Sequence, residues 1–265
     1  MADLPVHTFE RGDDVVVYTR SGRSGGPVFV LVHGIGMGRG VFGDLVEELS
    51  REGEVVALDL PGFGDSPKPR RPLDMPACGG LVAALLDDLG VRDGVLVGHS
   101  MGAQVVAETL VRHPHLRGRA VLVSPTVNPA ERSALLQGLR LLQDIAIESP
   151  KVLALGAIHY VKAGPVWYAK TLRRMVDHRI EDVLPQLDAD TLVIRGEVDK
   201  VSPREWAREV ARLVPRGVLR EVPDRGHEAM IRTAQPAASL IAAHAAGTSG
   251  RPPDAGTPRG DTVEE

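Results

Sequence analysis

One serine of the chain lies in a segment that is typical of an activated nucleophile. Residues 98–102 read Gly-His-Ser-Met-Gly, so that Ser100 is the centre of a Gly-x-Ser-x-Gly motif. The motif follows the apolar run 95–97 and precedes residues 101–112, whose pattern predicts a helix. A serine on a tight strand-to-helix turn presents its hydroxyl above the sheet, and glycines on either side avoid crowding in that turn. The sequence therefore predicts that Ser100 is a nucleophile.

A serine hydroxyl attacks efficiently only when a base accepts its proton and a third group holds that base in one orientation. Among the nine histidines, His227 is best placed to be this base, because it lies in a turn directly after the last apolar run, 218–222. Loops at the carboxyl ends of strands are where an open α/β sheet presents its ligand groups. The alternative interpretation of His227 is an ordinary surface residue of a loop.

The third group should lie between the serine and the histidine in the chain. Asp199 follows the apolar run 191–195 and is our candidate, with Glu197 as the competing carboxylate. A helix-capping aspartate is the structural alternative for Asp199, because a helix is predicted to begin nearby, at residue 204. The other usual place for the acid, after the run 120–123, offers only Ser124 and Asn128, and neither of them carries a charge.

Acyl transfer also needs N–H donors for the oxyanion, each worth roughly 3 kcal/mol. Met101 supplies one N–H at the start of the helix after Ser100, and Ile35 is the candidate for the second. Ile35 lies in the loop 33–40, His-Gly-Ile-Gly-Met-Gly-Arg-Gly, whose glycines let the backbone approach a substrate oxygen. These glycines fit neither a dinucleotide-binding nor a P-loop pattern, which excludes those two functions.

Alternating strand and helix patterns must position these residues. Residues 6–9 and 15–18 predict a hairpin. The other predicted strands cover residues 28–32, 55–58, 95–97, 120–123, 191–195 and 218–222. The predicted helices cover residues 41–49, 81–89, 101–112, 204–213 and 236 to about 244. This alternation predicts an α/β fold, with a mostly parallel sheet covered by helices on both faces.

A long interruption, residues 126–187, separates two of the predicted strands and favours an inserted helical cap. The core domain would then comprise residues 1–125 and 188–246, and the polar segment 247–265 is expected to be a disordered tail. Within the cap, Trp167, Tyr168 and Leu139 are the candidate substrate-binding residues. The wider candidate lining consists of Leu135, Leu142, Ile158, Leu172 and Met175.

Composition narrows the class of protein. The chain has 265 residues, of which 43% are hydrophobic, and a net charge of −4 without a basic block, so that no nucleic-acid partner is expected. The single cysteine, Cys78, excludes an internal disulfide, and no metal-ligand spacing is present. We expect no cofactor and no metal. The sequence shows no signal peptide, and no apolar run approaches the roughly 20 residues needed to span a bilayer. We therefore expect a cytoplasmic monomer or homodimer that does not bind membranes.

Together these motifs resemble the α/β-hydrolase family over residues 6–245. The resemblance rests on five segments: 33–34 (His-Gly), 59–66 (Asp-Leu-Pro-Gly-Phe-Gly-Asp-Ser), 98–102, 196–199 (Gly-Glu-Val-Asp, followed by Pro203) and 226–227 (Gly-His). It implies an eight-stranded sheet, a bracing role for His33 in the oxyanion loop, and a structural role for His99. Because Ser100 stands where haloalkane dehalogenases and epoxide hydrolases have an aspartate, the resemblance disfavours their reactions.

The sequence therefore predicts a serine hydrolase that cleaves a small or medium apolar ester, thioester or lactone through an acyl-enzyme intermediate. The low aromatic content, 3%, leaves few stacking partners for an aromatic substrate. One alternative is a carbon–carbon bond hydrolase, for which Arg173, Arg174 and Arg195 could hold a substrate carboxylate. The other is a non-catalytic homologue that binds a small molecule.

Overall fold

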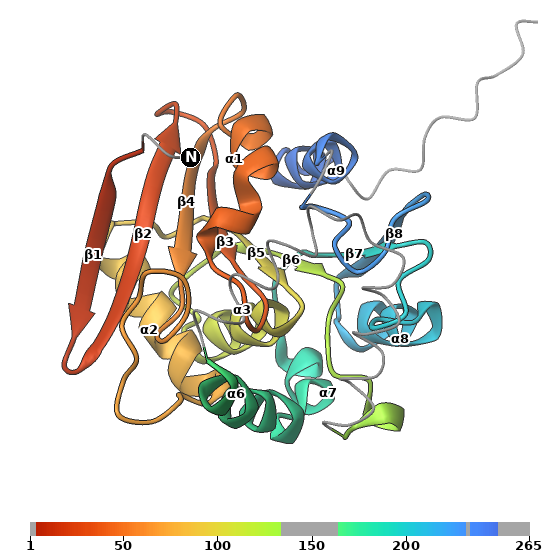
Figure 1. Ribbon diagram of the computed structural model, residues 1–265. Helices are drawn as coiled ribbons and strands as arrows, with labels where there is room; N and C mark the ends of the chain where they lie inside the picture. The colour runs from red at the N-terminus through yellow and green to blue at the C-terminus, as the bar shows by residue number, and fades with distance from the viewer. Residues whose placement is uncertain (1–3, 134–163, 232–233, 249–265) are drawn as a thin grey trace, which may run out of the picture.

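The computed structural model describes residues 4–133, 164–231 and 234–248. An eight-stranded sheet with the order β1-β2-β4-β3-β5-β6-β7-β8 forms its centre (Figure 1). The strands are β1 (Val6–Arg11), β2 (Asp14–Gly22), β3 (Val28–Val32), β4 (Glu54–Asp59), β5 (Val95–His99), β6 (Arg119–Val123), β7 (Thr191–Gly196) and β8 (Gly217–Val222). β2 pairs antiparallel with β1 and β4, and the other neighbours are parallel. The mostly parallel eight-stranded sheet is therefore confirmed.

Central strands such as β3, Val-Phe-Val-Leu-Val, are continuous apolar runs because both of their faces are buried. Val30 and Val32 point into one core, whereas Phe29 and Leu31 point into the other, as the alternation of side chains along a strand requires.

Helices cover both faces of the sheet (Figure 1). The core on one face is completed by α1 (Gly43–Leu49) and α9 (Gln235–Ala245). The core on the other face is completed by α2 (Met75–Asp88), α3 (Met101–Arg112) and α8 (Arg204–Leu213). The carboxyl ends of the parallel strands, where the candidate catalytic residues were predicted, therefore lie at one edge of a three-layer structure.

Two helices differ from their predicted bounds. α2 begins at Met75 instead of residue 81, because Asp74 caps it by accepting the Ala77 N–H at 2.9 Å and Pro76 follows in the first turn. The predicted helix 41–49 is split into a 3-10 helix, η1 (Arg39–Phe42), and α1. The N–H of Arg39 donates to the buried Asp59 at 2.5 Å, which fixes the chain before α1 begins.

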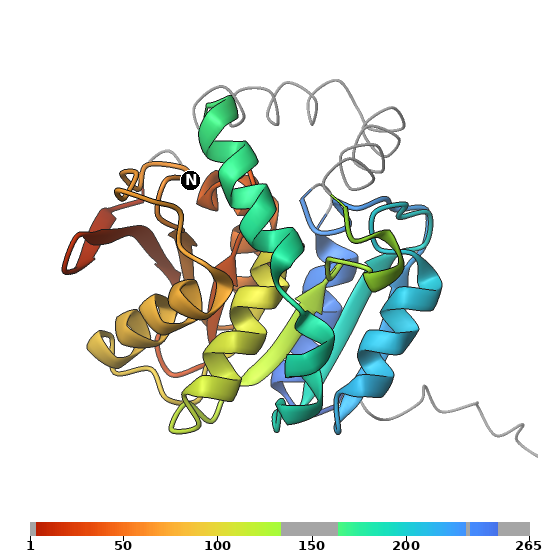
Figure 2. The same ribbon diagram turned by 90° about the horizontal axis from the view of Figure 1, so that it is seen from below.

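The described parts of the long segment between β6 and β7 are largely helical. They contain the 3-10 helix η2 (Pro129–Glu131), α6 (Pro165–Asp177), α7 (Ile180–Val183) and the 3-10 helix η3 (Leu184–Gln186). Figure 2 shows α6 in green, running obliquely toward α3, and the side chain of Gln104 in α3 donates to the carbonyl of Met175 at 3.1 Å. The predicted cap residues Leu135, Leu139, Leu142 and Ile158 lie outside the described residues, as does the predicted tail beyond residue 248.

Candidate active site

Ser100 occupies a strained turn between β5 and α3. Its φ of 54° and ψ of −116° lie outside the usual regions for a residue with a side chain, and its N–H donates to the carbonyl of Val123 at 2.9 Å. A Cβ at Gly98 would lie 2.2 Å from the carbonyl oxygen of Gly102, so that only glycine allows the chain to turn this sharply. Strain of this kind persists where the surrounding structure enforces it, which is common at functional sites.

The loop after β3 packs directly against this turn. A Cβ on Gly34 would lie 3.1 Å from Cβ of Ser100, which places Ile35, the next residue, beside the serine. Met101 is the first residue of α3, and an N–H in the first turn of a helix has no acceptor within the helix. The structure thus brings both candidate oxyanion donors to the neighbourhood of Ser100.

Asp199 and His227 form a buried pair from the loops after β7 and β8. Oδ2 of Asp199 lies 3.2 Å from Nδ1 of His227, and both residues are 3% exposed. Because a carboxylate only accepts hydrogen bonds, Nδ1 carries the proton and Nε2 is left as an acceptor. Glu197, the competing carboxylate, is exposed, and its Oε2 accepts the N–H of Asp224 at 3.3 Å. Of the two carboxylates, the structure pairs Asp199 with the histidine.

The backbone around Asp199 holds its carboxylate in the charged form. Oδ1 accepts the N–H groups of Val201 and Ser202, each at 2.8 Å. Burial alone would raise the pKa of Asp199, but the positive charge and hydrogen bond of His227, the N–H of Ser202 and the nearby Ser124 hydroxyl lower it below its usual range. Asp199 can therefore stabilise a positive charge on His227.

Arg195 supports the same loop from beneath. Arg195 is 2% exposed, and its guanidinium donates to the carbonyls of Ser202 and Asp199, each at 3.1 Å, and to the carboxylate of Glu221. Its hydrogen bonds are thus directed into the protein. Arg195 positions the Asp199 loop and is not placed to hold a substrate carboxylate.

His99, next to the serine, links the turn to the His227 loop. Its side chain is fully buried, Nε2 donates to the carbonyl of His227 at 3.0 Å, and the two rings lie 5.0 Å apart. Burial, followed by the nearby His227, lowers the pKa of His99 to about 3. His33 is also buried, and its Nε2 accepts the N–H of Leu60 at 3.0 Å. Both histidines occupy the structural positions that the resemblance implies.

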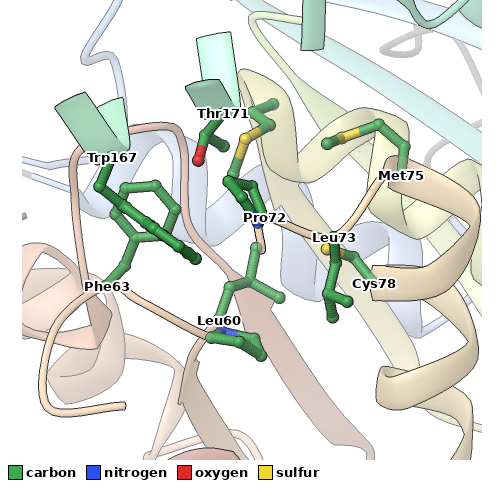
Figure 3. Close-up of a pocket in the computed structure, with 10 residues that line it drawn as sticks. Leu60, Phe63, Pro72, Leu73, Met75, Cys78, Trp167 and Thr171 are labelled. Atoms are coloured by element: carbon green, nitrogen blue, oxygen red, sulfur yellow. The ribbon is translucent and has the colours of Figure 1, made fainter. Parts of the chain in front are cut away.

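Helix α6 covers this region through two aromatic residues. The ring of Tyr168 lies over Gly36, where a Cβ would be 2.7 Å from Cε2, and the indole of Trp167 lies over Gly62, where a Cβ would be 2.3 Å from Nε1. Beneath α6 is a small pocket that includes Met101 in its wall (Figure 3). Its lining residues are Leu60, Pro61, Phe63, Pro72, Leu73, Met75, Cys78, Met101, Trp167 and Thr171.

One protein-family model covers the segments that carry these residues. The model described as "Alpha/beta hydrolase family" matches residues 29–243, which include the serine turn and both loops of the Asp199–His227 pair. This chain belongs to the alpha/beta hydrolase family. Membership makes a hydrolase the expected class of protein and leaves the substrate open.

Several proteins are similar to this hydrolase over most of their length. The AB hydrolase superfamily protein YisY of Bacillus subtilis (strain 168) is 24% identical over 262 residues, which cover 89% of this chain and 97% of that protein. A crystal structure of a membrane phospholipase A aligns with a TM-score of 0.80 and 25% identity, covering 94% of this chain and 88% of the other. A thermophilic esterase from Thermogutta terrifontis aligns with a TM-score of 0.77 and 23% identity, covering 92% and 99% of the two chains.

Sequence reasoning missed three residues of this site in the hydrolase. Ser124, beside Asp199, was considered only as a replacement for the acid, and Arg195 only as a carboxylate ligand. Thr171 faces the pocket and was not singled out at all. A charged residue that ends the apolar strand Thr-Leu-Val-Ile-Arg was a usable signal for Arg195, whereas nothing local distinguishes Thr171.

Two features are absent from the described part of the chain. Among residues 4–133, 164–231 and 234–248, no three His, Cys, Asp or Glu side chains are arranged to hold a metal ion. No helix within these ranges is both long enough and apolar enough to span a bilayer.

Proposed function

We propose that this protein is a serine hydrolase that cleaves a small or medium apolar ester, thioester or lactone through an acyl-enzyme intermediate. The observation that carries the proposal is the buried Asp199–His227 pair, 3.2 Å apart, whose histidine loop is bound to the strained turn that carries Ser100. We assign Ser100 as nucleophile, His227 as base and Asp199 as the group that orients and stabilises His227.

In the first half of the reaction, Nε2 of His227 takes the proton of the Ser100 hydroxyl while Oγ bonds to the acyl carbon. The carbonyl electron pair moves onto oxygen, where the N–H groups of Met101 and Ile35 stabilise the negative charge. When the oxyanion collapses, the bond to the leaving oxygen or sulfur breaks, and the leaving group takes the proton from His227. The acyl group then remains bound to Ser100.

In the second half, a water molecule attacks the acyl carbon and gives a proton to His227. Collapse of the second tetrahedral intermediate releases the carboxylic acid and returns that proton to Ser100. Asp199 stays charged throughout and stabilises the imidazolium twice in each cycle.

The apolar character of the substrate is inferred from the pocket beside Met101, whose wall is mostly carbon and sulfur. The esterase named among the similar structures supports an ester substrate. We further propose that residues 126–187 form the cap that closes the site, with Trp167 and Tyr168 as its substrate-facing residues, because both rings pack on the loops next to Ser100.

For the carbon–carbon hydrolase alternative, three arginines are the candidates to hold the substrate carboxylate, and their positions in the described residues disfavour this role. Arg195 is occupied by the Asp199 loop. Arg173 is highly exposed and pairs with Asp177, and Arg174 is exposed on the same helix. The charged, oriented Asp199–His227 pair argues against a homologue that has lost its catalytic residues, and active-site labelling distinguishes an enzyme from a receptor that retains them.

The decisive experiment combines turnover with active-site labelling. Ser100→Ala should lower kcat for p-nitrophenyl esters by about 10⁶-fold and abolish labelling by a fluorophosphonate probe, while Ser24→Ala, at an exposed serine, should change neither. A ring-fission product tested in parallel separates ester from carbon–carbon cleavage. Purified Ser100→Ala with turnover comparable to that of the wild type would overturn the mechanism, and wild-type protein that binds but neither turns over nor labels would indicate a receptor.

A further inference from the structure

Two polar atoms of α6 are buried beside the pocket without a hydrogen-bond partner. They are Nε1 of Trp167 and Oγ1 of Thr171, and Thr171 is only 4% exposed. The two residues are four positions apart, which places them on the same side of the helix. Figure 3 shows both descending from α6 toward Leu60 and Pro72. Both residues line one pocket, and the edge of the indole that carries Nε1 also lies against Gly62.

Two comparable residues in the described part of the chain have partners. Thr109, buried in α3, donates to the carbonyl of Val105 at 2.8 Å, which is the usual bond of a helical threonine to the residue four positions earlier. Nε1 of Trp206 donates to the carbonyl of Pro125 at 2.9 Å. A buried group left unpaired costs about 1–3 kcal/mol, so that the two orphaned donors of α6 require an explanation.

The other side chains of the pocket offer these two donors no strong hydrogen-bond acceptor. Its other side chains end in carbon or in the sulfur of Met75, Cys78 and Met101, and sulfur is a weak acceptor. None of the lining side chains carries a charge. The cavity measures about 10 Å³, which is close to the room needed by one water molecule. The site thus fits a small neutral group that accepts hydrogen bonds.

The position of the pocket relates that group to the reaction. Met101, whose N–H we assign to the oxyanion, belongs to its wall and directly follows Ser100. Trp167 also lies over Gly62, and its neighbour Tyr168 lies over Gly36, so that α6 holds both donors against the loops that border the serine. The pocket is thus bordered by the residue that follows the nucleophile, and any substrate group that enters it must be small.

We propose that the substrate carries a second, neutral acceptor oxygen, of an ether or a carbonyl, on a short chain beyond the carbonyl that Ser100 attacks. Trp167 and Thr171 both donate to this oxygen. This inference rests on the proposed hydrolase function and narrows its substrate class from plain apolar esters to oxygenated ones. A site that hydrogen-bonds a substrate atom discriminates against an analogue that lacks the atom, because its buried donors are then left unpaired.

The test compares esters that differ only by one oxygen. p-Nitrophenyl butyrate is matched with the methoxyacetate, and p-nitrophenyl pentanoate with the 3-methoxypropanoate, so that oxygen replaces a different chain carbon in each pair. The ratio of kcat/KM for ether over hydrocarbon is measured for the wild type, Thr171→Val and Trp167→Phe. In at least one pair the ratio should fall by about three- to tenfold for each donor removed, and Thr109→Val should leave it unchanged.

A second measurement does not depend on activity. Because the Thr171 hydroxyl has no partner in the free protein, Thr171→Val should melt at the same temperature as the wild type or above it, whereas Thr109→Val should melt below it. A lower melting temperature for Thr171→Val would assign the hydroxyl a structural role and overturn the proposal.

The outcomes separate this inference from the function on which it rests. Ester hydrolysis that needs Ser100, with ether-to-hydrocarbon ratios unchanged in both variants and both pairs, would overturn the oxygenated substrate alone. Wild-type protein that hydrolyses none of the four esters, or hydrolysis that survives in Ser100→Ala, would overturn the serine hydrolase and this inference together.

Discussion

Substitution of His99 should weaken the dependence of stability on pH. The ring of His99 is completely buried and donates to the carbonyl of His227. Burial, together with the charge of His227, lowers the pKa of His99 from 6.5 to about 3 in the folded protein. The unfolded chain, which has no such environment, should take up a proton near pH 6.5.

The direction in which stability changes with pH depends on whether the folded or the unfolded state binds the proton. Above pH 6.5 the ring is neutral in both states, and its contribution does not change with pH. As the pH falls below 6.5, the unfolded chain binds a proton that the folded chain excludes until about pH 3, so that stability is lost across this window. A pKa difference of about 3.5, at about 1.4 kcal/mol for each pH unit, gives about 5 kcal/mol in full and about 3 kcal/mol by pH 4.5.

Urea unfolding at pH 7.5 and pH 4.5, followed by tryptophan fluorescence, measures this loss in the wild type and in His99→Gln. The wild type should lose about 3 kcal/mol more between the two pH values than the variant does. Each protein is compared with itself, so that the general cost of the substitution cancels. Parallel losses in the two proteins would refute the reasoning, as would an NMR titration in which the ring of His99 protonates near pH 6.5.

Two more substitutions, each with a matched control, test Asp199 as the catalytic acid residue and the contact between Gly36 and Tyr168. Asp199→Asn should lower kcat by about 10⁴-fold through the wrong histidine tautomer, and Glu197→Gln should stay near wild type in the same ester assay; equal losses would contradict the assignment of the acid. Gly36→Ala and Gly12→Ala both put alanine at positive φ and should each cost about 1–2 kcal/mol in unfolding experiments. Only Gly36→Ala should also change KM, because its Cβ would lie 2.7 Å from the Tyr168 ring, whereas a Cβ at Gly12 would meet nothing within 4 Å. Equal KM values for the two variants would show that Tyr168 does not border the substrate.

The fold could be predicted wherever local signals agree with the tertiary environment. The bounds of β3, α3 and α8 coincide with their predicted ranges, because each has a clear apolar pattern and an abrupt boundary. The start of α2 was missed because its first turns contain Gly79 and Gly80, which weaken a helical pattern. Gly79 is explained by packing: a Cβ there would lie 2.9 Å from the backbone nitrogen of Thr109 in α3. That reason is a contact between helices and cannot be seen in the local sequence.

The candidate catalytic residues could be predicted for a related reason. Ser100 directly follows β5, and Asp199 and His227 lie in the loops after β7 and β8, so that the parallel strands bring all three residues to one edge of the sheet. Their supporting contacts could not be predicted in the same way. Arg195 acts by hydrogen bonds to backbone carbonyls of the loop that follows its own strand, and a backbone acceptor leaves no mark on the identity of the residue that provides it.

The pocket is the least predictable part because its walls come from segments that share no strand register. Trp167 lies over Gly62, about a hundred positions earlier in the chain. Thr171 is recognisable only because its buried hydroxyl lacks a hydrogen-bond partner. Mutations in the strand-end loops and mutations in the pocket should therefore have different kinetic effects. Changes in the strand-end loops act on transition-state charge and should appear in kcat with every substrate, whereas changes on the pocket side of α6 should alter the preference between substrates. A variant of Thr171 that slowed all four matched esters equally would therefore place that residue with the catalytic loops and not with the pocket.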